Sequence, residues 1–247
     1  LTPLLQPAGE GYPTFMRNRA WTDKCLHTAL SSWVELQSDI RFQTQQSTTP
    51  TTPTGTSEIG YVEPYPHLYA QLAGLTKSLR EGLMARDSLP TDAGDKLIEL
   101  EMFLSRLSDI AEKELNNTEL TSEEVDFLRD LDGELEALIA FRRVPALSLE
   151  GVQPSQPLAG YVGEQGVSVA DLFKNPRGGK ALKGAVGEAF KIYVLVPKGS
   201  EFILTQGGIC AYYEFPWPTS DDLTEATWRS MDRPDRPPWT KSFIAPK

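Results

Sequence analysis

Cysteine and histidine are scarce in this 247-residue chain, which contains two of each. Cys25 and Cys210 are too few for a disulfide scaffold and cannot form a zinc site by themselves. We expect two buried free thiols, with a single bridge as the alternative in an exported protein. His27 and His67 lie in different predicted elements, and only an arrangement of both with Glu63 would suggest a metal site. The sequence therefore predicts no metal and no cofactor.

Long apolar runs and clustered positive charge are also missing. No stretch is apolar enough for a membrane span, and no signal peptide is visible. The net charge of −10 argues against binding to nucleic acid or to an anionic membrane. Residues 87–136 contain sixteen Asp or Glu against four Lys or Arg, a net charge of −12, which is typical of a solvated helical hairpin. Because the chain begins at Leu1 and not at Met, we expect it to be a piece of a larger protein.

Helical periodicity dominates the first half of the chain. Residues 20–47 predict a long helix that would serve as the spine of the domain. Its inward stripe would consist of apolar residues at steps of four, four, three and four: Cys25, Ala29, Trp33, Leu36 and Ile40. On this prediction Trp33 lies in the core.

Three more amphipathic helices are predicted after a Thr- and Pro-rich segment at 48–57. The second helix begins near Pro66 and has an inward leucine stripe: Leu68, Leu72, Leu75, Leu79 and Leu83. The third covers residues 90–115, and the fourth begins with a T-x-x-E capping box formed by Thr121 and Glu124 and runs to about residue 141. Four such helices favour an acidic antiparallel bundle over residues 1–143.

The remaining chain changes its pattern. Residues 144–166 are rich in Pro and Gly and predict a linker. Residues 167–173, 191–197 and 201–215 read as strands, 179–189 as a short helix or a loop, and 223–231 as a short helix. The predicted class is α+β, mainly α: a helical bundle, then a small α+β tail at 167–247 packed on the bundle.

Catalytic candidates are few. Glu35 and Asp39 are four residues apart and share one helix face, and together with Asp171 they would form the carboxylate site of a hydrolase-like enzyme, between bundle and tail. No serine stands in a G-x-S-x-G or S-x-x-K setting, and the Gly-rich segment at 179–187 lacks the spacing of a phosphate loop.

Aromatic residues gather in the segment YYEFPWP at 212–218. Tyr212, Tyr213 and Trp217 could form a platform that binds a sugar, a peptide or a partner protein, because Tyr and Trp are enriched at interface hot spots. The alternative is that the segment closes the gap between tail and bundle inside the chain.

Four co-linear segments resemble an uncharacterised bacterial family, domain of unknown function 3160. The similarity covers residues 12–244 and rests on ALSSWVELQSDIRFQTQQS, GYVEPYPHLYAQLAGL, VSVADLFKNPRGGKALKGAVGEAFKIYVLVP and GICAYYEFPWPTSDDLTEATWRSM. The resemblance implies that the chain corresponds to the carboxy-terminal third of longer proteins that are exported or lipid-anchored, so we expect an extracytoplasmic location.

Two departures from the family pattern weaken an enzymatic role. The family motif S-W-x-E-L-R-H-D reads Ser32 to Asp39 here, with Gln37 and Ser38 in place of Arg and His. The motif V-A-D-V-H-T reads Val169 to Lys174, with Phe173 in place of His. We therefore predict a non-catalytic structural or interaction module that packs against the rest of its parent polypeptide or against another protein subunit.

Overall fold

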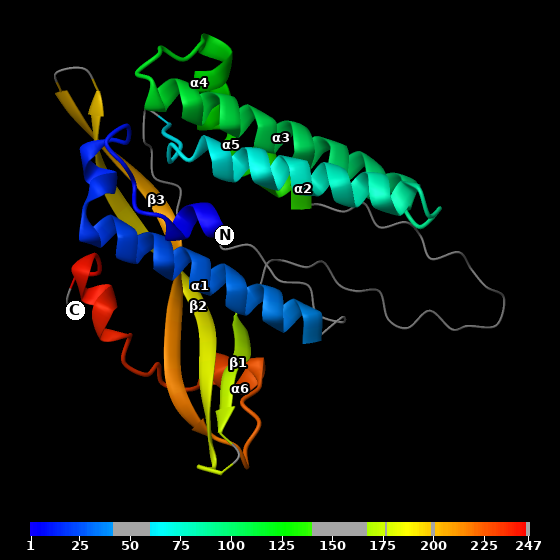
Figure 1. Cartoon of the computed structure of the whole chain (residues 1–247), viewed down its shortest axis with the longest axis vertical. Helices are drawn as coiled ribbons and strands as arrows, with labels where there is room; N and C mark the ends of the chain where they lie inside the picture. Colours follow the sequence, from blue (N-terminus) through cyan, green and yellow to red (C-terminus); the bar gives the residue numbers. More distant parts are fainter. Residues whose placement is uncertain (42–59, 140–166, 176, 199–200, 246–247) are drawn as a thin grey trace. The chain divides into compact units, whose positions relative to one another are not determined.

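The computed structural model describes residues 1–41, 60–139, 167–175, 177–198 and 201–245 (Figure 1). The chain divides into two compact units. Unit 1 comprises Leu1–Gly55, Tyr161–Pro197 and Phe202–Lys247, and unit 2 comprises Thr56–Gly160 with Lys198–Glu201. This division differs from the predicted bundle at 1–143 and tail at 167–247, because the first long helix groups with the strands. The predicted linker at 144–166 lies outside the described residues.

Unit 2 is built on two long helices, α2 (Pro66–Met84) and α3 (Thr91–Leu115). They run antiparallel, since Ser108 near the end of α3 donates a hydrogen bond to the carbonyl of Pro66 at the start of α2 (3.0 Å). Farther along the pair, Arg80 forms an ion pair with Glu101 (3.0 Å). Two shorter helices follow, α4 (Ser122–Arg129) and α5 (Leu131–Ile139).

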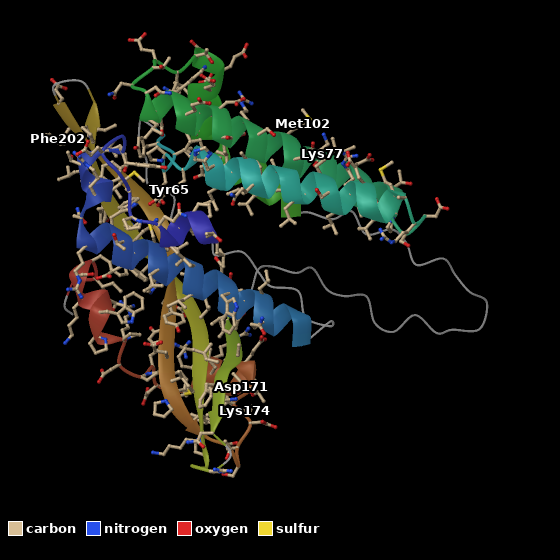
Figure 2. All side chains as sticks on the ribbon, viewed as in Figure 1. Tyr65, Lys77, Met102, Asp171, Lys174 and Phe202 are labelled. Atoms are coloured by element: carbon tan, nitrogen blue, oxygen red, sulfur yellow. The ribbon has the colours of Figure 1, made fainter. Side chains whose placement is uncertain are left out.

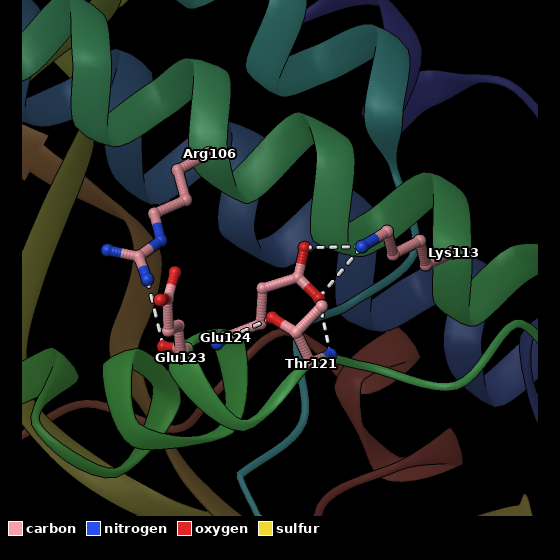
Figure 3. A network of polar contacts seen from close by, with 5 residues as sticks. All are labelled: Arg106, Lys113, Thr121, Glu123 and Glu124. Carbon is pink, nitrogen blue, oxygen red and sulfur yellow. Dashed lines mark hydrogen bonds and ion pairs between the residues drawn. The ribbon is translucent and has the colours of Figure 1, made fainter.

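The predicted capping box is confirmed at the start of α4 (Figure 3). Thr121 Oγ1 accepts from the backbone N–H of Glu124 (3.3 Å), whose carboxylate accepts from the N–H of Thr121 (2.8 Å). Lys113 on α3 donates to the same carboxylate (2.7 Å), so the cap also ties α4 to α3. The single helix predicted up to residue 141 is instead two helices, with a break at Asp130.

The inward leucine stripe predicted for α2 is wrong. The buried positions of this helix are Ala73 and Thr76, and the core of unit 2 is completed by α3 and α4 residues including Leu107 and Phe127. Leu75 is 65% exposed, and Leu72 and Leu79 are exposed with it. Small side chains at the α2–α3 contact let the two helices approach closely, which leaves the leucines outside.

Unit 1 contains a three-stranded sheet in the order β1-β2-β3, formed by β1 (Ser168–Asn175), β2 (Lys180–Lys198) and β3 (Glu201–Pro218). β1 pairs antiparallel with the first part of β2, with Val169 opposite Ala185. Residues 179–189, for which a short helix or a loop was predicted, thus belong mostly to a strand. Gly184 relieves crowding there, because a Cβ atom would lie 2.8 Å from side-chain methyl groups of both Leu172 and Val34.

The sheet is covered on both faces. Helix α1 (Arg19–Arg41) packs on one face, where its Val34 meets a cluster of Ala170, Val186 and Tyr212. The short helix α6 (Glu225–Ser230) packs on the other face and inserts Trp228. That second cluster contains the strand residues that alternate with the first set: Val169, Ala185, Ala211, Tyr213 and Phe215. Alternation therefore gives one hydrophobic layer to each helix.

The predicted burial of Trp33 is wrong. Trp33 is 37% exposed and Leu36 is exposed as well, whereas Val34, predicted to lie off the stripe, is fully buried. The helix rests on a sheet, so the buried face turns toward Val34 and away from Trp33. Cys25 and Ala29 are buried as predicted, and the side chain of Ile40 lies outside those described.

Six α-helices and one small antiparallel sheet in the described residues confirm the predicted α+β, mainly α class. Three short 3-10 helices complete unit 1: η1 (Thr2–Leu5), η2 (Thr14–Arg17) and η3 (Pro238–Ser242). The last of these brings the proline-rich carboxy-terminal segment against α1.

Candidate functional site

A histidine, His27, lies in the middle of α1. It is fully buried, and its Nε2 accepts a hydrogen bond from the backbone N–H of Tyr212 on β3 (3.1 Å). An accepting Nε2 places the proton of the neutral imidazole on Nδ1. Nδ1 has no hydrogen-bond partner within the described part of the chain.

Four aromatic rings surround this imidazole. Phe190 on β2, Tyr212 on β3, and Trp239 and Phe243 at the carboxy-terminal η3 lie with centroids 5.4–6.1 Å from that of His27, all in edge-on arrangements. Residues from four separate elements therefore form one aromatic cage. We call His27 and these four rings the His27 cage.

Burial lowers the pKa of His27 to about 4, and the positive charges of Arg236 and Lys24 contribute in the same direction. The imidazole is therefore neutral at pH 7. A neutral histidine could act as a base, but that role needs access to a substrate or to water. Full burial denies this access, so the geometry indicates that His27 joins α1 to the sheet.

Tyr212 and Tyr213 are buried, which contradicts the prediction that they form an exposed binding platform. Tyr212 belongs to the His27 cage, and its hydroxyl donates to Glu214 (3.1 Å). Burial raises its pKa, and Glu214 adds to the shift. The ring of Tyr213 packs on the opposite face against Trp228 (5.2 Å between centroids). Adjacent residues of a strand point to opposite faces, and here both faces are covered.

Trp217, the third residue of the predicted platform, is partly buried against the same cluster as Trp228. Its ring lies edge-on to Phe215 (6.1 Å between centroids). The segment at 212–218 therefore packs into the core of unit 1.

Asp171, one of the candidate catalytic carboxylates, forms a buried ion pair with Lys183. The two residues lie opposite each other on β1 and β2, and their Oδ1 and Nζ atoms are 2.6 Å apart. Both side chains are only 8% exposed. Lys174, on β1 with Asp171 (Figure 2), contacts its second oxygen from the surface (2.9 Å). A carboxylate held between two ammonium groups is strongly paired and is a poor general base.

Glu35, another of the candidate carboxylates, lies on helix α1. It is half-buried on α1, near enough to Cys210 to add to the effect of burial, which raises the pKa of that thiol to about 11. The side chain of Asp39 lies outside those described. Cys25 and Cys210 are not joined in a disulfide, and Cys25 is buried, as predicted.

Unit 2 has its own buried polar cluster, which periodicity could not reveal. The carboxylate of Glu114 on α3 accepts from the N–H of Val62 (3.2 Å). Burial raises the pKa values of Tyr61 and Tyr69, and the negative charges of Glu63 and Glu114 add to both shifts. The cluster anchors the segment before α2 to the end of α3.

No group of three or more potential metal-binding side chains occurs among the described residues. Within the same residues, no helix has the length and apolarity that a membrane crossing requires. The conspicuous surface features are instead two sets of exposed apolar side chains, one on α2 and one on the β2–β3 hairpin.

These features define an α+β protein in which His27 lies in a buried aromatic cage and Asp171 in a buried ion pair. A family model described as "Protein of unknown function (DUF3160)" matches residues 1–240. The chain therefore belongs to this family, which confirms the resemblance seen in the sequence. No curated protein and no solved structure matches the chain.

Proposed function

We propose that this chain is a non-catalytic interaction module that binds another protein, or the remainder of its parent polypeptide, through the far end of the β2–β3 hairpin. The observation that carries the proposal is the exposure of four large apolar side chains there. Tyr193, Leu195, Phe202 and Leu204 are 58–68% exposed. Phe202 marks this end of the hairpin in Figure 2.

The β2–β3 hairpin extends beyond the part of the sheet that includes β1. Among the described residues, β1 pairs with β2 only from Lys180 to Val186, so in this part of the chain the second half of β2 has a neighbouring strand on the β3 side alone. A two-stranded ribbon is marginally stable in water unless one face is packed against something. One set of side chains is already covered, since Val196 and Ile209 are buried.

The exposed side chains share one face of this ribbon. β2 ends at Lys198 and β3 begins at Glu201, so pairing from that end sets Leu195 opposite Leu204. Two contacts support this register: Thr205 donates to the carbonyl of Val194 (3.1 Å), and a Cβ atom on Gly207 would lie 3.5 Å from Ile192. Tyr193 and Phe202 fall on the same face as the two leucines.

A contiguous apolar face with a Tyr and a Phe fits a protein partner, because aromatic side chains dominate interface hot spots. Acidic nucleic acid is disfavoured by the net charge of −10. The burial of His27, Asp171 and Lys183 argues against an enzymatic role for these three side chains.

Site-specific photo-cross-linking in the source cells tests the proposal. A photoreactive residue at position 204 should yield one defined cross-linked protein, identified by mass spectrometry, whereas the same residue at the exposed position 226 on α6 should not. Phe202→Ser, in a chain that carries the probe at 204, should abolish the product.

The same Phe202→Ser change should leave the unfolding free energy within about 0.5 kcal/mol, since the side chain is exposed. Identical products at positions 204 and 226, or none at 204, would refute the proposed surface.

A further inference from the structure

The exposed leucines of α2 form a continuous seam. Leu68, Leu72, Leu75 and Leu79 follow one another at steps of four, three and four, the spacing of the apolar positions in a coiled coil. Leu68 is half-buried and the other three are exposed. We call these four residues the leucine seam. The core contact of α2 uses neighbouring positions, Ala73 and Thr76, so the seam is additional to the packing of unit 2.

Charge is absent from the seam. At 100° per residue, Lys77 and Glu81 lie roughly 150° or more around the helix from the centre of the seam. Arg80 points toward α3, where it pairs with Glu101. Unit 2 contains the segment with a net charge of −12, so two copies would repel each other over most of their surface. Two copies of the chain can pack against each other through the leucine seam without that repulsion.

The spacing of the seam is palindromic, because four-three-four reads the same in both directions. A two-fold symmetric contact requires a surface that is its own complement. Two antiparallel copies of α2, with the symmetry axis between residues 73 and 74, would set Leu68 against Leu79 and Leu72 against Leu75. No residue of the seam is left without an apolar counterpart in this alignment.

We propose that two copies of this chain associate through the leucine seam in an antiparallel, two-fold symmetric dimer. The contact spans about 16 Å of helix from Leu68 to Leu79. One helix pair of this length buries less than the roughly 800 Å² per partner of a standard interface. We therefore expect the dimer to be weak.

Sedimentation equilibrium of the full chain over a concentration series reaching the sub-millimolar range tests the dimer. Leu75→Gln should raise the dissociation constant at least tenfold. The matched control is Met102→Gln, an equally exposed apolar residue on α3 outside the seam, which should leave association unchanged. Added salt should strengthen association, because it screens repulsion between the acidic units and leaves apolar contacts intact.

The register has a separate test. A mixture of Leu68→Cys and Leu79→Cys chains under mild oxidation should form the mixed disulfide in preference to either homodimer, whereas a parallel dimer would give the homodimers. Three results would overturn the proposal: a monomer at all concentrations, a dimer insensitive to Leu75→Gln, or a monomer that Leu75→Gln clearly destabilises, since the seam is then covered within one chain. A dimer lost in Leu204→Gln but not in Leu75→Gln would place self-association on the hairpin and would also overturn it.

Discussion

Replacing His27 with a residue that does not titrate should make the stability of unit 1 depend less on pH in the acid range. The pKa of this residue is about 4 in the folded chain against 6.5 for an unperturbed histidine. A lowered folded-state pKa means that the unfolded state binds the proton first as the pH falls. Stability is therefore lost below about pH 6.5, and the loss is complete near pH 4.

The size of the effect follows from the two pKa values. Between pH 7 and pH 5 the linkage amounts to about 2 kcal/mol, and the full difference in pKa corresponds to roughly 3 kcal/mol. Lys24 and Arg236 add positive charge around the ring, and Tyr212 with its partner Glu214 closes the side toward β3. Protonation would also remove the acceptor that Nε2 offers to the Tyr212 N–H.

The assay is urea unfolding followed by tryptophan fluorescence at several pH values. All five tryptophans, at positions 21, 33, 217, 228 and 239, belong to unit 1, so the signal reports this unit selectively. The variant His27→Gln keeps an oxygen that can accept a hydrogen bond from the Tyr212 N–H, but it does not titrate. The difference in unfolding free energy between wild type and this variant should therefore shrink by about 2 kcal/mol from pH 7 to pH 5.

His67→Gln is the matched control, because His67 is the only other histidine and is exposed on α2. The stability of the His67→Gln variant should follow that of the wild type at every pH. If wild type and His27→Gln lose stability in parallel between pH 7 and pH 5, His27 does not remain neutral in the folded chain and the inferred cage is wrong.

Three further predictions concern packing and charge in unit 1 and use the same unfolding assay. Trp228→Ala should cost roughly 3–5 kcal/mol because the ring is fully buried, whereas the more exposed Trp33→Ala should cost clearly less; equal losses would contradict the assigned face of α1. Gly184→Ala should destabilise by about 1–3 kcal/mol, because the added methyl group overlaps the two side chains that contact it, and an unchanged stability would contradict this close approach. Asp171→Asn should cost about 3–5 kcal/mol by leaving the Lys183 ammonium buried without a countercharge, and the double change with Lys183→Met should recover much of that loss; additive losses would argue against a direct pair.

Local features of the chain could be predicted from the sequence alone. The start of α2 at Pro66, the capping box of Thr121 and Glu124, and the strand at 168–175 depend on neighbouring residues and on backbone preferences. These interactions act over a few residues, so a linear pattern contains them. The α+β, mainly α class follows from the same local signals.

The candidate site depended on contacts that are distant in sequence. Lys183 gave no signal as the partner of Asp171, because strand register is needed to place the two residues opposite each other. The cage around His27 combines residues separated by up to 216 positions, from His27 to Phe243. No periodicity links such positions. The proline-rich end of the chain gave no sign that the ring of Trp239 would be part of the His27 cage.

What the sequence by itself determined is where most helices and strands form, together with the acidic character of the segment at 87–136. Only the tertiary structure decided which of two apolar stripes each helix buries: Val34 in place of Trp33 on α1, and Ala73 in place of Leu75 on α2. The hydrophobic effect rewards burial of any apolar surface and does not specify its direction. The choice is made by steric fit, because a sheet accepts a different face of α1 than a helix would, and α3 approaches α2 most closely over its small side chains.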